Sequence, residues 1–379
     1  MNFIAWKMLT GDKAKYISLI FSIAFASFLI SQQASIFAGL MQRTTSQIID
    51  VRDAGIWVMD PATQYVDEVK ALPDSALYRV RDVRSVAWAV PFFKGQATCR
   101  APDGKFRGVI LLGIDDATLV GVPRNMLVGK AEDLERPDAI ILDRAGYEYF
   151  FPDQPLHTGA VFEMNDHRAV LVGICEASAP FATFPVMYTR FSLARDYVGR
   201  ERDQLSFVLA TARPGFSNAT VCAAITETTG FRAETTDQFG WRTISYYLNH
   251  TGIPVNFGIT IVVAIIVGAV VAGQTFYIFT LENLKQFGAL KAIGVTDLRL
   301  VGMILLQALI VALSGFALGL GLAAEFFEVT IHRTATRGFV LLWPAVIGTG
   351  VLILVIVMLA SLLSVRKVIT TEPAIVFRG

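Results

Sequence analysis

Charged residues are scarce in this chain and are missing from four long stretches. Asp, Glu, Lys and Arg make up 17% of the 379 residues, whereas hydrophobic residues make up 54%. This balance is too apolar for a typical water-soluble domain. The charge-free stretches are residues 16–42, 251–281, 300–324 and 338–365. Each is longer than the roughly 20 residues with which a helix crosses about 30 Å of hydrocarbon. The sequence therefore predicts an α-helical membrane protein with four transmembrane helices.

Motifs for catalysis and metal binding are also missing. The chain has no G-x-x-x-x-G-K-[ST] phosphate loop, so we do not expect it to hydrolyse ATP, and it has no H-E-x-x-H or C-x-x-C pair. Residues 215–219 lack the last glycine of a nucleophile elbow, and Ser217 is better explained as a helix cap. The four histidines are scattered: His157, His167, His250 and His332. We expect no catalytic residue, no metal and no cofactor on this chain.

The distribution of charge excludes two further classes of protein. The formal net charge is +1, so no general basic field attracts nucleic acid. No Asp, Glu, Lys or Arg lies at mid-membrane depth in any predicted span. Proton relays and ion pathways usually need such groups, which disfavours a secondary transporter or a channel.

The short flanks of the spans predict the orientation. Basic residues precede the first span, separate the second from the third and follow the fourth: Lys7, Lys13 and Lys15; Lys285, Lys291 and Arg299; Arg366, Lys367 and Arg378. The other short loop, residues 325–337, balances two arginines against two glutamates. By the positive-inside rule, both termini and residues 282–299 are expected in the cytoplasm. Residues 1–15 are predicted to form an interfacial helix, residues 16–42 an uncleaved signal anchor and stalk, and residues 366–379 a cytoplasmic tail.

Residues 43–250 are then expected outside the membrane as a mixed α/β domain. Runs rich in β-branched and aromatic residues predict strands at 55–59, 85–90, 107–112, 139–142, 169–174 and 206–210. A helix is predicted over residues 218–228, with Ser217 as its cap. The three cysteines, Cys99, Cys175 and Cys222, all lie in this domain. An oxidising compartment permits one disulfide among them, but no pairing follows from the sequence.

A short charged segment, residues 282–299, separates the second and third spans. Good helix formers run over residues 282–293, Gly294 is expected to end the helix, and Thr296 is a candidate cap for the next one. The residues of the segment stand in the order Glu282-x-x-Lys285-Gln286-Phe287-Gly288-Ala289-Leu290-Lys291-Ala292-Ile293-Gly294.

Helical spacing arranges the apolar residues of this segment on adjacent faces. Leu284, Phe287 (or its neighbour Gly288) and Lys291 share one face, while Leu290 and Ile293 continue a stripe beside it. An apolar surface with basic neighbours is suited to docking into a groove of another protein. An ordinary amphipathic helix lying at the lipid headgroups is the alternative.

The segment resembles the cytoplasmic coupling segment of the MacB/FtsX/LolC superfamily (type VII) of ABC transporter permeases. The consensus sequence of that segment is close to E-x-x-R-E-I-G-x-L-R-A-x-G. This chain departs from the consensus by having Gln286 in place of the second Glu and Phe287 in place of Ile. The tail over residues 364–378, in which Pro373 follows a basic helix end, is similar to the closing segment of the family. The resemblance implies these ATPase-coupling residues: Glu282, Lys285, Gln286, Phe287, Gly288, Leu290, Lys291, Ala292, Ile293 and Gly294. It implies that Arg366 and Lys367 contact the ATPase or anionic headgroups.

The resemblance also implies an organisation and a set of partners. The outer domain would comprise a porter-like part, residues 45–115 and 203–240, with residues 116–202 inserted as a smaller subdomain. A DevC-like or LolC-like permease would bind a separate cytoplasmic ABC ATPase, which holds ATP and Mg. It would pair with a second copy or a paralogue, contact membrane lipid and, in a cell with two membranes, a periplasmic adaptor (membrane fusion) protein.

Three functions remain open at this point. The first is a permease that exports or extracts a lipid, lipoprotein or amphiphile by mechanotransmission. The second is an FtsX-like transducer that transports nothing and activates a periplasmic hydrolase. The third is a membrane-anchored receptor or enzyme unrelated to ABC systems. Small residues in the spans, Gly268, Gly315 and Gly319, allow another helix to approach closely, either within the chain or in a dimer.

Overall fold

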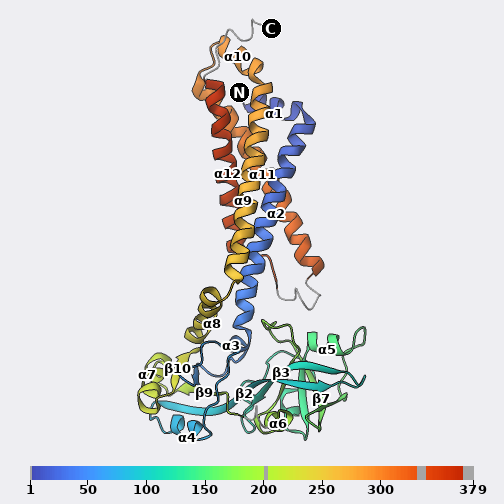
Figure 1. Cartoon of the computed structure of the whole chain (residues 1–379), viewed down its shortest axis with the longest axis vertical. Coiled ribbons are helices and arrows are strands. Elements are labelled where there is room, and N and C mark those ends of the chain that lie inside the picture. Colours follow the sequence, from blue (N-terminus) through green and yellow to red (C-terminus); the bar gives the residue numbers. More distant parts are fainter. Residues whose placement is uncertain (1, 200–203, 331–338, 370–379) are drawn as a thin grey trace. The chain divides into compact units, whose positions relative to one another are not determined.

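In the computed structural model the chain divides into two units, Met1–Gly39 with Gly252–Gly379, and Leu40–Thr251. The structure describes residues 2–199, 204–330 and 339–369. The first unit is helical, and the second is built on a β-sheet (Figure 1).

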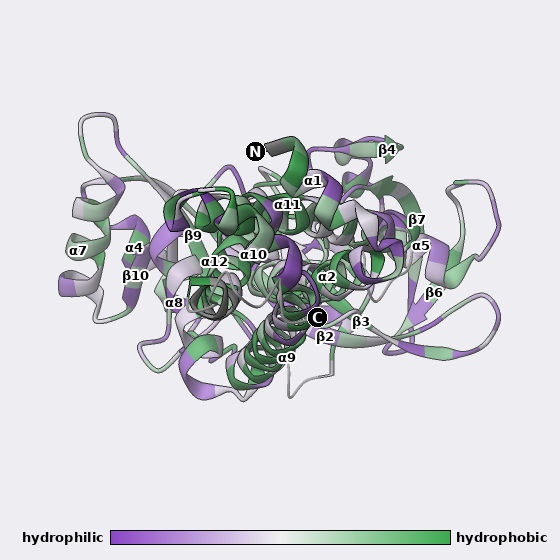
Figure 2. Ribbon diagram, turned by 90° about the horizontal axis from the view of Figure 1, so that it is seen from above, coloured by the Kyte–Doolittle hydropathy of each residue, from purple (hydrophilic) through white to green (hydrophobic). Residues whose placement is uncertain are grey.

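The helical unit contains four long helices, which confirms the four predicted spans. They are α2 (Lys13–Thr44), α9 (Ile253–Glu282), α11 (Asp297–Thr330) and α12 (Trp343–Ile369), and each has a segment long and apolar enough to cross a membrane. Seen end-on in Figure 2, these helices are coloured mostly as hydrophobic. Two short helices accompany them, α1 (Asn2–Gly11) and α10 (Leu284–Ala292). The predicted loop over residues 325–337 is shorter than expected at its start, because α11 continues to Thr330.

Glycines allow α2 to lie close to its neighbours. A Cβ atom at Gly319 would come within 2.3 Å of the Ala24 carbonyl oxygen, and one at Gly315 within 2.6 Å of an Ile23 methyl carbon. On α9, a Cβ at Gly268 would lie 2.8 Å from that of Ala26. All three small residues predicted to favour helix packing therefore face α2 of the same chain.

The second unit is a mixed α/β domain, as predicted. Its sheet has the strand order β10-β1-β9-β2-β3-β8-β5-β7-β4, and β6 pairs with β2 and β7. The strands are β1 (Ile56–Met59), β2 (Val86–Arg100), β3 (Phe106–Ile114), β4 (Met126–Val128), β5 (Ala139–Asp143), β6 (Val161–Met164), β7 (His167–Cys175), β8 (Val186–Arg190), β9 (Phe207–Ala212) and β10 (Arg232–Thr235). The helices are α3 (Ser46–Asp50), α4 (Ser75–Arg81), the 3-10 helix η1 (Ala131–Glu135), α5 (Arg144–Phe150), α6 (Phe191–Tyr197), α7 (Asn218–Thr229) and α8 (Thr236–His250).

The long strand β2 joins the two halves of the sheet. Residues 86–92 pair with β9, whereas residues 93–100 pair with β3. The strand predicted over residues 85–90 is thus only the first part of β2. Strand β3, which lies in the predicted porter-like part, pairs in parallel with β8, which lies inside the predicted insertion of residues 116–202. The two halves of the sheet meet where β2 changes partner.

Alternating side chains give the sheet two apolar faces. One face carries a core that extends through both halves and includes Trp57, whose ring centroid lies 5.4 to 5.6 Å from those of Phe92, Phe207 and Phe239. Phe239 belongs to α8, so this helix covers that face beside β1. The opposite face is covered by α4 and α7 in one half and by α5 and α6 in the other.

Two details of the domain can be compared with what the sequence suggested, namely the start of α7 and the state of the cysteines. Helix α7 begins as predicted, because the Ser217 hydroxyl accepts a hydrogen bond of 3.1 Å from the Thr220 amide. The cysteines form no disulfide with one another, and Cys99, Cys175 and Cys222 are all buried. Burial raises the pKa of Cys99 and of Cys222 to about 12, which keeps both thiols protonated.

Candidate functional site: the coupling segment

The candidate site is α10 and the turn that follows it. Helix α9 ends at Glu282, α10 begins at Leu284, and Gly294 separates α10 from α11. Gly294 has φ +92°, a left-handed conformation that glycine adopts without strain, so it ends the helix where the sequence predicts. Figure 1 shows α1 at the same end of the helical unit as α10.

One face of α10 turns into the protein. Phe287 is only 1% exposed and Gly288 is buried beside it. The Phe287 ring belongs to a cluster drawn from α1, α11 and α12: Ala5, Met8, Leu300, Met303, Ile304 and Val365. Leu284 and Leu290 pack against the same cluster. The interpretation of Phe287 as part of an exposed docking surface is therefore wrong, because its own chain supplies the groove.

Lys291 also serves the fold rather than an outer surface. Its ammonium lies 2.9 Å from an Asp297 carboxylate oxygen and donates a hydrogen bond of 2.9 Å to the Ile369 carbonyl. These contacts tie α10 to the start of α11 and to the end of α12. Lys291 is among the predicted coupling residues, and in the structure its ammonium contacts Asp297 and Ile369 of the same chain.

The opposite face of α10 is exposed. Lys285, Ala289 and Ala292 follow one another at helical spacing on that face, with Gln286 beside them. Beyond them, Ile293 is 77% exposed and Leu298 is 81% exposed, one on each side of the Gly294 turn. We define Lys285, Ala289, Ala292, Ile293 and Leu298 as the outward face.

The predicted coupling residues fall on both faces of α10. Of the outward face, Lys285, Ala292 and Ile293 were predicted from the sequence, whereas Ala289 and Leu298 were not. A large apolar residue is in most cases buried, and this rule would have predicted the burial of Phe287.

Glu282 joins the segment to the beginning of α2. The Lys15 ammonium forms an ion pair with Glu282 and another, at 2.9 Å, with Asp12 in the turn between α1 and α2. The hydrogen bond from Lys15 lowers the pKa of Asp12 below its ordinary value. Because these groups are well exposed, the pairs position the chain more than they stabilise it.

Helix α1 is held in place by a polar contact inside an apolar region. The side-chain amide of Gln307, buried on α11, donates a hydrogen bond of 2.9 Å to the Ala5 carbonyl. A buried amide without a partner costs free energy, so this bond favours one position of α1 on α11. The other predicted contact residues, Arg366 and Lys367, lie in the last turns of α12, and their side chains fall outside the described part of the structure.

A bundle of four apolar helices with a mixed α/β domain between the first and the second defines a multi-span membrane protein. Residues 258–373 match the FtsX-like permease C-terminal family. An ABC transporter permease of Mycobacterium tuberculosis is 32% identical over 117 residues, which are 30% of this chain and 31% of that protein. A protein of Staphylococcus haemolyticus named as a hemin transport system permease, HrtB, is 28% identical over 108 residues, 28% of this chain and 30% of that one. The matched region thus spans less than a third of each relative.

The α/β domain is similar in chain path to two solved structures. The periplasmic region of MacB from Actinobacillus actinomycetemcomitans has a TM-score of 0.37 at 13% identity, covering 53% of this chain and 97% of that one. The extracellular domain of the transporter YknZ from Gram-positive bacteria has a TM-score of 0.35 at 12% identity, covering 48% and 98%.

The last three long helices thus match the FtsX-like permease C-terminal family, and the relatives that share this region are named ABC transporter permeases. The chain is an integral protein of the bacterial inner membrane.

Proposed function

We propose that this chain is the permease subunit of an ABC transporter that transmits the motion of a separate ATPase to the α/β domain. In this proposal both termini and α10 lie in the cytoplasm and the α/β domain lies outside. The substrate would be a lipid, lipoprotein or other amphiphile, exported or extracted by mechanotransmission. Two permease chains, identical or paralogous, would each bind one ATPase. A periplasmic adaptor would complete the assembly in a cell with two membranes.

The observation that carries the proposal is the division of α10 into two faces. The inner face, around Phe287, is anchored in the helical unit, and the outward face presents Ile293 and Leu298 to solvent. An apolar side chain exposed by more than three-quarters is available for contact with another molecule. Together with a cation such as Lys285, it is suited to a partner groove with an apolar floor and an acidic rim.

The mechanism follows from how α10 is anchored. A partner that binds the outward face can move α10 only by moving what the inner face contacts, which includes α1 and α11. Closure of two ATPases on ATP would displace both copies of α10 and so tilt the spans. Work would reach the outer domains without a hydrated pore, in keeping with spans that lack charged residues.

The test is retention of the ATPase on the full-length permease. The tagged chain is purified from its native membrane in mild detergent, and the ABC ATPase that accompanies it is identified by mass spectrometry. Ile293→Asp and Leu298→Asp are expected to reduce binding at least tenfold, since truncation of a central apolar contact costs about 2 kcal/mol or more. Leu127→Asp is the matched control, because it places the same charge on an exposed apolar site in the α/β domain.

Wild-type ATPase retention by both α10 variants would show that the outward face is not the docking surface. Loss of the ATPase from the Leu127→Asp control as well would assign the loss to general damage. Lys285→Glu serves as an additional variant, because Lys285 is exposed. Lys291→Glu and Phe287→Asp are unsuitable as tests of ATPase docking, because both side chains hold α10 in place and their loss would disturb the helical unit itself.

A further inference from the structure

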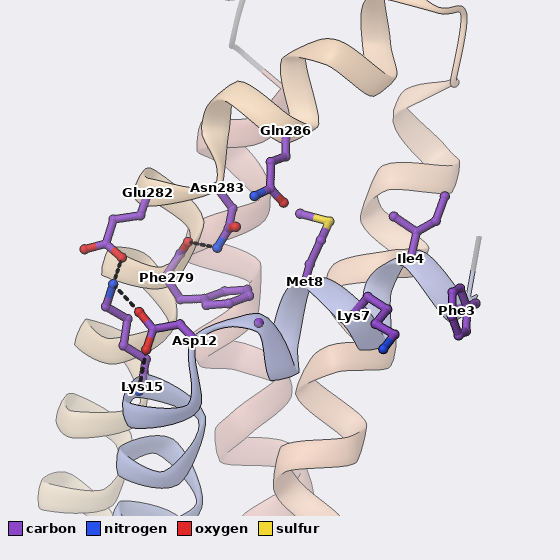
Figure 3. Close-up of a pocket in the computed structure, with 11 residues that line it drawn as sticks. Phe3, Ile4, Lys7, Met8, Asp12, Lys15, Phe279, Glu282, Asn283 and Gln286 are labelled. Carbon is purple, nitrogen blue, oxygen red and sulfur yellow. Dashed lines mark hydrogen bonds and ion pairs between the residues drawn. The ribbon is translucent and has the colours of Figure 1, made fainter.

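A cavity of about 470 Å³ lies between α1 and the junction of α9 with α10 (Figure 3). Its apolar wall includes Phe3, Met8 and Phe279. Its polar wall includes Lys7, Asp12, Lys15, Glu282, Asn283 and Gln286. The proposed ATPase-docking role assigns no function to the cavity, because the outward face of α10 does not line it.

The position of the cavity along the helices fixes its depth in a membrane. Glu282 is the first charged residue after the apolar run of α9, and Lys15 is the last one before the apolar run of α2. Charged residues at the ends of spans lie where hydrocarbon gives way to lipid headgroups. Phe279, one turn deeper on α9, extends the wall toward the hydrocarbon. The cavity is therefore open to the region that phospholipid headgroups occupy.

The charges around the cavity are balanced, with Lys7 on one side and Lys15, Asp12 and Glu282 together on the other. Two lysines and two carboxylates line it, so its formal net charge is zero. Figure 3 shows Lys7 on one side, and Asp12 and Glu282 on the other. The Lys7 ammonium lies 5.7 Å from the Phe3 ring centroid, within the range of a cation–π contact. On the other side Lys15 occupies part of the hydrogen-bonding capacity of the two carboxylates, which between them offer several lone pairs.

We propose that this cavity binds the headgroup of a zwitterionic aminophospholipid of the phosphoethanolamine type. The phosphate would lie beside Lys7 and the side-chain amide of Gln286, which are donors. The ammonium would lie beside the carboxylates of Glu282 and Asp12, which are acceptors. The acyl chains would leave along Phe3 and Phe279.

The alternatives fit the cavity less well. A phosphoglycerol headgroup would bring one uncompensated negative charge next to two carboxylates. A choline headgroup has no N–H group to donate to those carboxylates. A headgroup with both a phosphate and a primary ammonium matches the two sides at once. Assignment of this lipid to the inner leaflet rests on the proposed orientation, whereas the binding itself does not.

The experiment is native mass spectrometry of the full-length chain, delipidated in detergent and titrated with phosphatidylethanolamine, phosphatidylglycerol and phosphatidylcholine of identical acyl chains. Phosphatidylethanolamine is expected to be retained preferentially. Lys7→Gln is expected to weaken that retention about tenfold, the effect of losing one hydrogen bond to a charged group. The matched control is Lys13→Gln, which removes the same charge from an exposed residue that does not line the cavity. The control is expected to retain the lipid as the wild type does.

Three results would overturn the assignment. They are equal retention of the three lipids, preference for phosphatidylglycerol, and equal weakening by Lys13→Gln and Lys7→Gln. ATPase retention, measured on the same preparations, keeps this test separate from that of the proposed function. If lipid selectivity fails while the ATPase remains bound, only the headgroup site is wrong. If the ATPase is not bound while selectivity persists, only the docking proposal is wrong.

Discussion

Asp67→Ala is expected to destabilise the α/β domain through a lysine that it leaves buried. Lys94 projects from β2 with only 6% of its side chain exposed, and its ammonium is ion-paired with Asp67. The Asp67 carboxylate also accepts a hydrogen bond of 3.3 Å from the Tyr247 hydroxyl on α8. Asp67 thus connects the centre of the sheet to the helix that precedes α9. Its removal breaks both contacts at once.

The magnitude follows from how deeply each partner is buried. Removal of one partner from a fully buried ion pair costs about 3–5 kcal/mol, because the other charge is left uncompensated. Asp67 is 36% exposed, so water can take its place in part, and we expect about 2–3 kcal/mol. For a domain of this size each kcal/mol lowers Tm by about 2–4 °C, which gives a fall of about 4–12 °C. Lys94→Met removes the buried charge itself and is expected to be neutral or stabilising.

The pH dependence provides an independent check of the same reasoning. Burial lowers the pKa of Lys94 from its ordinary value of 10.5, although the Asp67 carboxylate opposes the shift. At a pH between the Lys94 pKa of the folded chain and that of the unfolded chain, the unfolded chain binds more protons than the folded one. The free energy of unfolding therefore rises with pH in that window and is lowest below the folded-state pKa. Asp67→Ala removes the opposing carboxylate. Its stability should therefore rise more steeply with pH than that of the wild type, whereas Lys94→Met should remove this contribution.

The assay is thermal unfolding of the full-length chain in detergent, monitored by tryptophan fluorescence. Trp57, which is buried in the core of the domain, is a probe of its unfolding. Wild-type Tm in Asp67→Ala, together with an unchanged pH dependence, would refute the reasoning. A loss of stability in Lys94→Met as large as that in Asp67→Ala would also refute it. The buried methylenes of Lys94, rather than its paired charge, would then be the stabilising feature.

Two further predictions concern packing and reactivity. Gly319→Leu is expected to separate α2 from α11 and lower the Tm of the helical unit. Gly321→Leu should leave the Tm unchanged, because no atom of the described residues lies within 4 Å of its Cβ position; equal effects would contradict close packing at Gly319. Cys99 and Cys222 are expected to resist maleimide at pH 8 in the folded chain and to react in denaturant, because both thiols are buried with a pKa of about 12; rapid modification of the folded chain would contradict this.

The sequence was sufficient to predict elements that depend on local composition. A span needs only a long run without charge, and a cap such as Ser217 needs only the next turn of its own helix. For the same reason Gly294 could be recognised as a helix end. These features are decided within a few residues of where they occur.

Features that depend on distant residues were not predictable in this way. Phe287 is buried because Ala5 and Met8, at the other end of the sequence, pack on it. The sequence predicted a strand only over residues 85–90, which end before Pro91. In the structure Pro91 lies inside β2 opposite Val208, and the strand continues to a second partner. Neither outcome is visible without the three-dimensional neighbours.

The anchoring of α10 determines what a force on its outward face would do. Phe287 attaches it by apolar contact to α1 and α11, Lys291 by polar contact to α11 and α12, and Glu282, next to its first residue, by an ion pair to Lys15 at the start of α2. Because these contacts reach four helices, rotation of α10 about any one of them strains the others. A small displacement is therefore shared among the spans rather than absorbed by a loop. A partner on Ile293 would move the helices together, which is what transmission through a bundle without a charged pathway requires.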